Sequence, residues 1–175
     1  GPACRQAGLG RVNPMCYSPF VLFEFWIRRL DMKRKVFLIS PVRNIAPETL
    51  EALGSYVAKL ESEGVEVYWP YRDTDQTDPH GWTICCRNRS AILDANEIHI
   101  WYDAKSTGSS FDNGMVFALL GVGWTKKVVI ANPEAVKPTP HKSFENVLLK
   151  LQEETEKLCA MREDIRKSAR HPSDL

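Results

Sequence analysis

"KVFLIS", residues 35–40, is the stretch that decides the fold. A continuous apolar run of this length is typical of a β-strand that is buried on both faces of a sheet, since a half-exposed strand would alternate apolar and polar residues. Pro41 ends the run. Strands buried on both faces belong to parallel sheets that helices cover on both sides, so strands and helices should alternate along the rest of the chain.

The remaining sequence has this alternation. The segment after Pro41 has Pro47 where a first helical turn would start, apolar residues at helical spacing, and Gly64 as a stop signal. Helices are predicted at 46–64, 82–95, 111–123 and 142–167, and further strands at 65–69, 97–102 and 126–132. The order predicts an α/β protein with a flavodoxin-like or Rossmann-like doubly wound parallel sheet of four to five strands and helices on both faces.

The composition changes abruptly at Met32. Residues 1–31 have no periodicity apart from the short apolar segment Phe20–Leu30, which is followed by no second apolar stretch before the first strand. We interpret residues 1–31 as an N-terminal extension, which is a tag remnant, an upstream segment or a misassigned start; the alternative is that Phe20–Leu30 docks on the domain or on a partner. Residues 32–167 are predicted to form a single domain, and 168–175 a loose tail.

The bulk numbers exclude several classes of protein. The chain has 175 residues, is 43% hydrophobic and carries a net charge of +1, which gives no field that favours nucleic acid polymers or anionic membranes. The longest apolar segment is too short to span a membrane. The five cysteines suggest no disulfide framework, and the adjacent Cys85 and Cys86 lack metal-ligand spacing. We therefore expect no metal, no cofactor and a cytoplasmic protein.

The doubly wound sheet directs attention to the loops at the carboxyl ends of its strands. Ligands of such sheets bind outside these ends, near the point where the strand order reverses. The loops concerned are "SPVRN" (40–44), "PYRDTDQTDPHG" (70–81) and "DAKSTGSS" (103–110), and polar or small residues concentrate in them.

The stretch "STGSSFDNGMVFAL" (106–119) leads from a Ser/Gly loop into a helix. Such a junction offers hydroxyls and free N–H groups to an anion such as phosphate. Asp112 is expected in the first helical turn, where the helix dipole would lower its pKa and keep it ionised. It would then suit attack on a sugar anomeric carbon, or the binding of a ligand hydroxyl. The plainer alternative is a helix cap, with Ser109 or Ser110 as the N-cap and Asp112 as a favourable partner of the dipole.

Other loop residues have two interpretations each. Arg43 could clamp a phosphate or be a solvated surface residue. Tyr71 could stack on a flat ring or pack its loop down. His99, between apolar residues of a strand, is predicted to be a packed strand residue.

"FLISPVRN" together with "STGSSFDNGMVFAL" resembles the nucleoside 2-deoxyribosyltransferase superfamily, including its 2′-deoxynucleoside 5′-monophosphate N-glycosidase branch. The family's loop and helix read roughly S-x-G-x-[GST]-x-E-x-G-x-A, and the resemblance covers about residues 35–132. Five residues here fall on that register: Ser106, Gly108, Ser110, Asp112 and Gly114. Two positions depart from the family: Asp112 replaces the usual Glu, and Asn88 stands near an Asp that many members carry on the second helix.

The resemblance implies an enzyme that cleaves the N-glycosidic bond of a nucleoside or nucleoside 5′-monophosphate, by hydrolysis or by deoxyribosyl transfer. It implies a small-molecule substrate and a homodimer or higher homo-oligomer. The alternatives are a non-catalytic nucleotide-binding or sensing module on the same fold, or an unrelated flavodoxin-like interaction domain. The implied catalytic residues are Asp112, as nucleophile, and Asn88; the implied substrate-binding residues are Arg43, Ser106, Gly108, Ser110, Tyr71 and Asp103.

Overall fold

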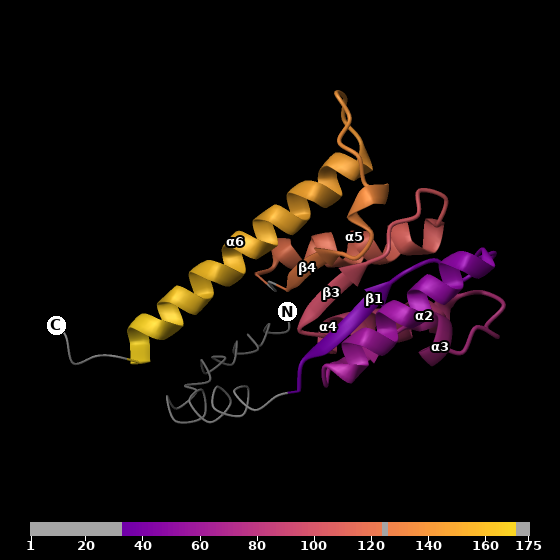
Figure 1. Ribbon diagram of the computed structural model, residues 1–175, viewed down its shortest axis with the longest axis horizontal. Helices are drawn as coiled ribbons and strands as arrows, with labels where there is room; N and C mark the ends of the chain where they lie inside the picture. The colour runs from indigo at the N-terminus through magenta and orange to yellow at the C-terminus, as the bar shows by residue number, and fades with distance from the viewer. Residues whose placement is uncertain (1–32, 124–125, 171–175) are drawn as a thin grey trace, which may run out of the picture. The chain divides into compact units, whose positions relative to one another are not determined.

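The computed structural model describes residues 33–123 and 126–170. Its centre is a four-stranded sheet in the order β2-β1-β3-β4, with every neighbouring pair parallel. The strands are β1 (Lys35–Ile39), β2 (Glu66–Tyr68), β3 (Glu97–Ile100) and β4 (Lys127–Ile130). This arrangement confirms the predicted α/β doubly wound fold (Figure 1).

Helices cover both faces of the sheet. They are α2 (Pro47–Ser62), α3 (Pro70–Asp73), α4 (Trp82–Asp94), α5 (Thr107–Gly121) and α6 (Phe144–Arg170), with a short 3-10 turn, η2, at Pro133–Ala135. Successive residues of β1 point to opposite faces. Val36 and Leu38 pack with Leu53 and Val57 of α2, whereas Phe37 belongs to the core that α4 and α5 complete. The double-sided burial expected of "KVFLIS" is therefore present: residues 36–39 are almost fully closed off from solvent.

The edge of β4 is covered by α6. Thr155 Oγ1 accepts a hydrogen bond from the Val128 N–H at 3.2 Å, and Gln152 Oε1 accepts one from the Ile130 N–H at 2.7 Å. These two side chains satisfy backbone donors that an edge strand would otherwise leave unpaired. They also show that α6 runs antiparallel to β4, because the later helical residue faces the earlier strand residue.

Most elements differ from the predicted bounds by a few residues, and two of these differences lie beside the candidate site. Residues 107–110, predicted as loop, form the first turn of α5, because Ser106 caps the helix by accepting a hydrogen bond from the Ser109 N–H at 3.3 Å. The predicted loop 70–81 begins with the short helix α3, whose first residue is Pro70. In both places a local start signal outweighs a run of small or polar residues.

Some predictions fall outside the described residues. The N-terminal extension 1–31 lies entirely outside them. Helix α6 continues through Arg170, and so includes the first part of the segment 168–175, while residues 171–175 are not described. Among the helices of the described ranges, none has the length and apolar character needed to cross a membrane.

Candidate functional site

The strand order places the switch point between β1 and β3. The chain leaves β1 toward α2 on one face and leaves β3 toward α5 on the other. The two carboxyl ends are held together by a 2.8 Å hydrogen bond from the Trp101 N–H to the Ile39 carbonyl. Next to them, the Asn132 side chain bonds both the N–H and the carbonyl of Tyr102, at 2.7 and 3.0 Å, and fixes the end of β3 to the end of β4. This is the edge at which a doubly wound sheet binds its ligand.

Asp112 lies in the second turn of α5 and is buried, with 7% of its surface exposed. Its Oδ2 accepts a hydrogen bond of 3.1 Å from the Asn88 amide on α4, which is equally buried. Asn88 Oδ1 in turn accepts one of 3.1 Å from the Thr74 hydroxyl, which also bonds the Tyr68 hydroxyl at 2.8 Å. The structure thus joins the two residues predicted to be catalytic, and connects them to the end of β2.

Burial raises the pKa of Asp112 to about 6, and the hydrogen bond from Asn88 opposes this only in part. The predicted lowering of this pKa is therefore wrong. The prediction placed Asp112 in the first turn, whereas α5 starts earlier and the dipole acts mainly within the first turn. Desolvation by the surrounding helices outweighs both favourable influences on the charged form.

The two oxygens of Asp112 differ in their surroundings. Asn88 holds Oδ2, while Oδ1 accepts no hydrogen bond from the described part of the chain. Within that part, Asn113 Oδ1 is the only fully buried side-chain oxygen or nitrogen without a partner, so Asp112 Oδ1 keeps some contact with solvent. One oxygen is thereby fixed and the other is left available for chemistry.

The first turn of α5 is bonded internally. Ser106 is the N-cap, so the expectation that Ser109 or Ser110 would cap the helix is wrong. The Ser106 and Ser109 hydroxyls bond each other at 2.8 Å, and the Ser110 hydroxyl donates to the Ser106 carbonyl at 3.1 Å. The N–H of Gly108 is one of the first-turn donors that an α-helix leaves without a backbone acceptor. Apart from its chain neighbours and the backbone of its own helix, a Cβ added to Gly108 would meet no atom within 4 Å.

The other predicted substrate-binding residues are not brought into contact with Asp112. Arg43 is exposed after β1, and Tyr71 is exposed and packs on Trp69, with their ring centroids 5.1 Å apart. Asp103 stabilises the turn before α5, where its carboxylate accepts the Lys105 N–H at 2.9 Å and its carbonyl accepts the Ser106 N–H at 3.1 Å. Arg43 and Asp103 remain at the carboxyl edge, each at the start of a connection that leaves the switch point.

Sequence reasoning missed two residues near the pair Asn88 and Asp112: Thr74, which bonds Asn88, and Cys85. Thr74 is a buried hydroxyl in a polar loop, and nothing in that loop's composition singles it out. Cys85 lies one helical turn before Asn88; burial and, to a lesser extent, the charge of Asp112 raise the pKa of its thiol. The pattern Cys85–Asn88, three residues apart on one helix, was the available signal.

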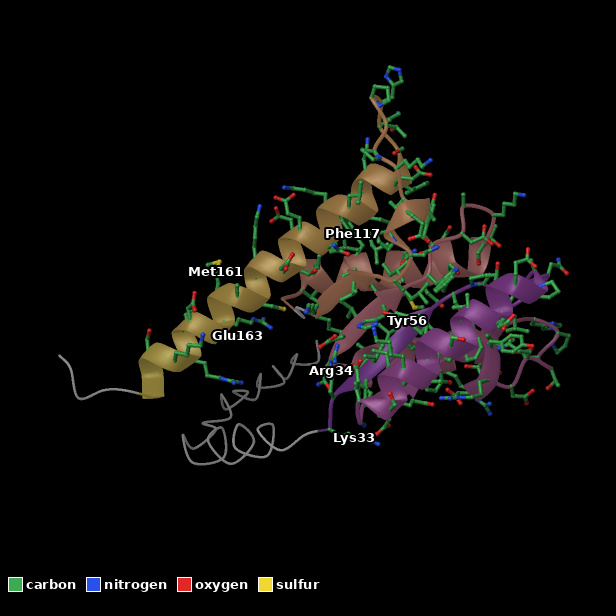
Figure 2. All side chains as sticks on the ribbon, viewed as in Figure 1. Lys33, Arg34, Tyr56, Phe117, Met161 and Glu163 are labelled. Carbon is green, nitrogen blue, oxygen red and sulfur yellow. The ribbon has the colours of Figure 1, made fainter. Side chains whose placement is uncertain are left out.

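A second, partly buried network lies at the opposite, amino end of the sheet. Glu97 accepts two hydrogen bonds from the Arg34 guanidinium, at 2.8 and 2.7 Å, and lies 3.1 Å from His99 Nε2. His99 Nδ1 lies 2.7 Å from the Tyr56 hydroxyl on α2. Figure 2 labels Arg34 at this end of the sheet and Tyr56 farther along, on α2. His99 is buried in β3, as predicted for a packed strand residue.

The described ranges contain no group of three or more His, Cys, Asp or Glu side chains that could hold a metal ion. A comparison with models of known protein families finds no match to this chain, and a comparison with curated protein sequences finds no relative.

Proposed function

We propose that the protein cleaves the N-glycosidic bond of a nucleoside or nucleoside 5′-monophosphate, with Asp112 as the nucleophile. The observation that carries the proposal is the environment of Asp112: a buried carboxyl group beside the switch point, with a pKa of about 6 and, among the described residues, the neutral amide of Asn88 as its one hydrogen-bond donor. Perturbed carboxyl groups of this kind gather at functional sites. The resemblance to the nucleoside 2-deoxyribosyltransferase superfamily supplies the reaction class.

The chemistry balances with the residues present. At pH 7 Asp112 is largely ionised, and its poor solvation makes it a stronger nucleophile than a surface carboxylate. An oxygen of Asp112 attacks C1′, the bond from C1′ to the base breaks, and the base leaves with the electron pair and takes a proton from water. Water or a second base then attacks C1′ of the ester, which releases the carboxylate. Asn88 holds Oδ2 during both steps and so orients Oδ1 toward the sugar.

The start of α5 is the proposed position of the 5′-phosphate. The first-turn N–H of Gly108, the hydroxyls of Ser106 and Ser110 and the guanidinium of Arg43 would supply donors, once the serines exchange their present bonds within the turn. In the proposed complex Tyr71 and Asp103 would contact the base or the sugar. As part of the same proposal, the protein acts in the cytoplasm as a homodimer or higher homo-oligomer.

A non-catalytic nucleotide-binding or sensing module is the second candidate. It is favoured by two side chains: Asp112 is one methylene shorter than the family's Glu, and Asn88 cannot donate a proton to a leaving base as a carboxyl group can. A shift of about one ångström at the nucleophile can reduce a rate about 10²-fold. Such a module would bind nucleotides and release no base.

Release of free base decides between the two candidates. The protein is incubated with a panel of nucleosides and nucleoside 5′-monophosphates, and free bases are measured by HPLC. Asp112→Asn keeps the shape of the side chain and should reduce release by on the order of 10³ or more. Glu66→Gln, an exposed acid on β2 at the amino end of the sheet, is the control and should retain most of it. Equal rates for Asp112→Asn and the unsubstituted protein would remove Asp112 as the nucleophile.

Two glycines of α5 test the position of the phosphate. At both Gly108 and Gly114, apart from the chain neighbours and the backbone of the helix itself, no protein atom lies within 4 Å of the position that a Cβ would take, so alanine fits at both and should stabilise the helix by about 0.5–1 kcal/mol or less. Gly108→Ala should weaken the binding of nucleoside monophosphates by about tenfold or more, because its methyl group occupies the proposed phosphate position. Gly114→Ala should not. If both variants bind monophosphates and unphosphorylated nucleosides like the unsubstituted protein, the phosphate lies elsewhere.

A further inference from the structure

Helix α6 extends well past the sheet that it covers. Thr155 faces Val128, and β4 begins one residue earlier, at Lys127. From Thr155 to the end of the helix at Arg170, the rise of an α-helix gives about 22 Å. Figure 1 shows this distal part of α6 continuing beyond β4. Packing against β4 therefore accounts for the position of the first half of α6, whereas it does not account for the position of the second half.

The distal part nevertheless carries exposed apolar side chains. Leu158 is 37% exposed, Met161 60% and Ile165 67%. Their spacing of three and four residues continues a seven-residue pattern that starts at the beginning of α6, which is the spacing of a coiled-coil seam. We call this set the α6 stripe; its exposed apolar members are Phe144, Val147, Leu158, Met161 and Ile165, Glu154 interrupts it, and Leu151, on the same pattern, is buried in the core of its own domain.

The proximal end of the α6 stripe borders a hollow of about 380 Å³ between α5 and α6. Its lining includes Val147 and Leu151 of α6 and Phe117 and Leu120 of α5, with Phe117 itself exposed (Figure 2). Glu154 also lines the hollow, and its Oε1 lies 2.9 Å from Lys150 Nζ. This ion pair balances the negative charge that Glu154 places within the stripe. The stripe and the hollow form one apolar surface of a kind that marks interaction sites.

We propose that the distal half of α6 pairs antiparallel with α6 of a second copy of this chain. In an antiparallel pair, Leu158 and Met161 of one copy meet Met161 and Leu158 of the other at the centre. Ile165 of each copy then approaches Glu154 of the other, at the hollow beside α5. The pairing covers the apolar side chains that β4 leaves exposed.

The charged residues that flank the α6 stripe favour pairing with a second copy of α6, and favour the antiparallel orientation over the parallel one. Lys157 and Asp164 flank the stripe on one side, and Arg162 flanks it on the other. In the antiparallel pair, Lys157 of each copy faces Asp164 of the other, so the interface contains two pairs of opposite charges. In a parallel pair Lys157 would face Arg162 of the second copy, and like charges would repel. Arg162 also donates a 3.0 Å hydrogen bond to the Gly123 carbonyl, which keeps it on the side of its own domain.

The test is the association of the full chain by sedimentation equilibrium over a wide range of concentrations. Met161→Glu, at the centre of the seam, should raise the dimer dissociation constant by 10²-fold or more. Asp164→Lys should raise it by about tenfold. Glu163→Lys is the matched control, because it makes the same charge change at the preceding residue, which points away from the seam. It should alter the dissociation constant by less than about twofold. Figure 2 labels Met161 and Glu163 on this part of the helix.

A charge reversal tests the orientation. Lys157→Glu combined with Asp164→Lys restores opposite charges across the antiparallel seam and should recover most of the affinity that Asp164→Lys loses. Circular dichroism of each variant checks that α6 remains helical. A chain that stays monomeric at every concentration, as it would if residues 20–30 covered the α6 stripe, overturns the proposal. So do equal effects of Asp164→Lys and Glu163→Lys, a dimer that tolerates Met161→Glu, or a reversal that restores nothing. The pairing specifies the homo-oligomer that is part of the proposed function, but base release is measured separately: a monomer that releases base would overturn the pairing and leave the proposed chemistry in place.

Discussion

Glu97, which is partly buried, and Asp112, which is buried, are two carboxyl groups at different ends of one sheet, and their pKa values move in opposite directions. Burial acts to raise the pKa of both. At Glu97 the hydrogen bonds from His99 and Arg34 outweigh burial and lower the pKa to about 2. At Asp112 the partner is the neutral amide of Asn88, burial prevails, and the pKa rises to about 6. The nature of the partner, together with the deeper burial of Asp112, decides which carboxylate the fold stabilises.

This difference has a consequence for stability. The lowered pKa of Glu97 means that its charged form stabilises the fold above about pH 4.5, and that this contribution is lost as the pH falls toward 2. The raised pKa of Asp112 means that the fold prefers the neutral acid, so stability falls as the pH rises from 3.8 to about 6. Glu97 therefore serves the fold at neutral pH, while the ionised Asp112 costs stability, as functional groups often do.

The largest expected effect on stability is that of Asp112→Asn. At 1.36 kcal/mol per pH unit, a pKa raised from 3.8 to about 6 corresponds to about 3 kcal/mol at pH 7. The amide carries no charge and its oxygen can still accept the hydrogen bond from Asn88, so the variant should be more stable by up to this amount. Urea unfolding at pH 7 and pH 4 measures it, and the gain should nearly vanish at pH 4. If Asp112→Asn were less stable than the unsubstituted protein at pH 7, the conclusion that ionised Asp112 costs stability would be contradicted.

Glu97→Gln should have the opposite sign and a smaller size. It removes the charge that pairs with Arg34 and should lower the free energy of unfolding at pH 7 by about 1–2 kcal/mol, since Arg34 is 44% exposed and solvent screens the pair. The loss should shrink as the pH falls from 4.5 toward 2 and should be reduced by salt. Glu66→Gln, an exposed acid on β2 at 3.9 Å from Lys35, is the matched control and should change little.

The pH dependence of base release tests the difference between Asp112 and Glu97 through activity. If ionised Asp112 is the nucleophile, kcat/KM should fall about tenfold for each pH unit below about 6. Glu97→Gln should leave the midpoint of this acidic limb unchanged, because Glu97 lies at the far end of the sheet. An acidic limb of the kcat/KM profile centred near pH 4, or one whose midpoint shifts in Glu97→Gln, would show that the ionisation of Asp112 does not control activity.

The smallest expected effects come from the outer member of each network. Thr74→Val removes the hydroxyl that bonds Asn88, and Tyr56→Phe removes the one beside His99; each should cost about 1 kcal/mol of stability. Thr74→Val should also raise the midpoint of the acidic limb by a few tenths of a pH unit, because Asn88 becomes a weaker donor to Asp112. Tyr56→Phe should not. Identical pH profiles for the two variants would show that Thr74 has only a structural role.

The fold could be predicted from the sequence because its main signals are local. The continuous apolar run at residues 35–40 and the alternation that follows it identify a parallel sheet without knowledge of any distant contact. The start of α5 could not be predicted as well. Residues 107–110 are small and polar, and their helical conformation depends on the Ser106 cap and on the packing of the later turns against the sheet.

The candidate site was only partly predictable. Asp112 and Asn88 could be named from the motif and the predicted helices. Their hydrogen bond and the raised pKa of Asp112 result from the packing of α4 against α5, which brings together residues 24 positions apart. The pairing of Arg34 with Glu97, across 63 positions, has no local signal at all. Burial and the choice of partner decide the charge of both acids, and both are tertiary properties.

The most direct test of the central claim is the capture of a covalent intermediate on Asp112. A 2′-fluoro-2′-deoxynucleoside 5′-monophosphate slows the second step of a nucleophilic glycosidase more than it prevents the first. Intact mass spectrometry should show the protein heavier by one fluorinated sugar phosphate, with release of one equivalent of base, and peptide mapping should place the added mass on Asp112. Base release without any adduct, an adduct on Asp103 or another residue, or an adduct that also forms in Asp112→Asn would contradict the account.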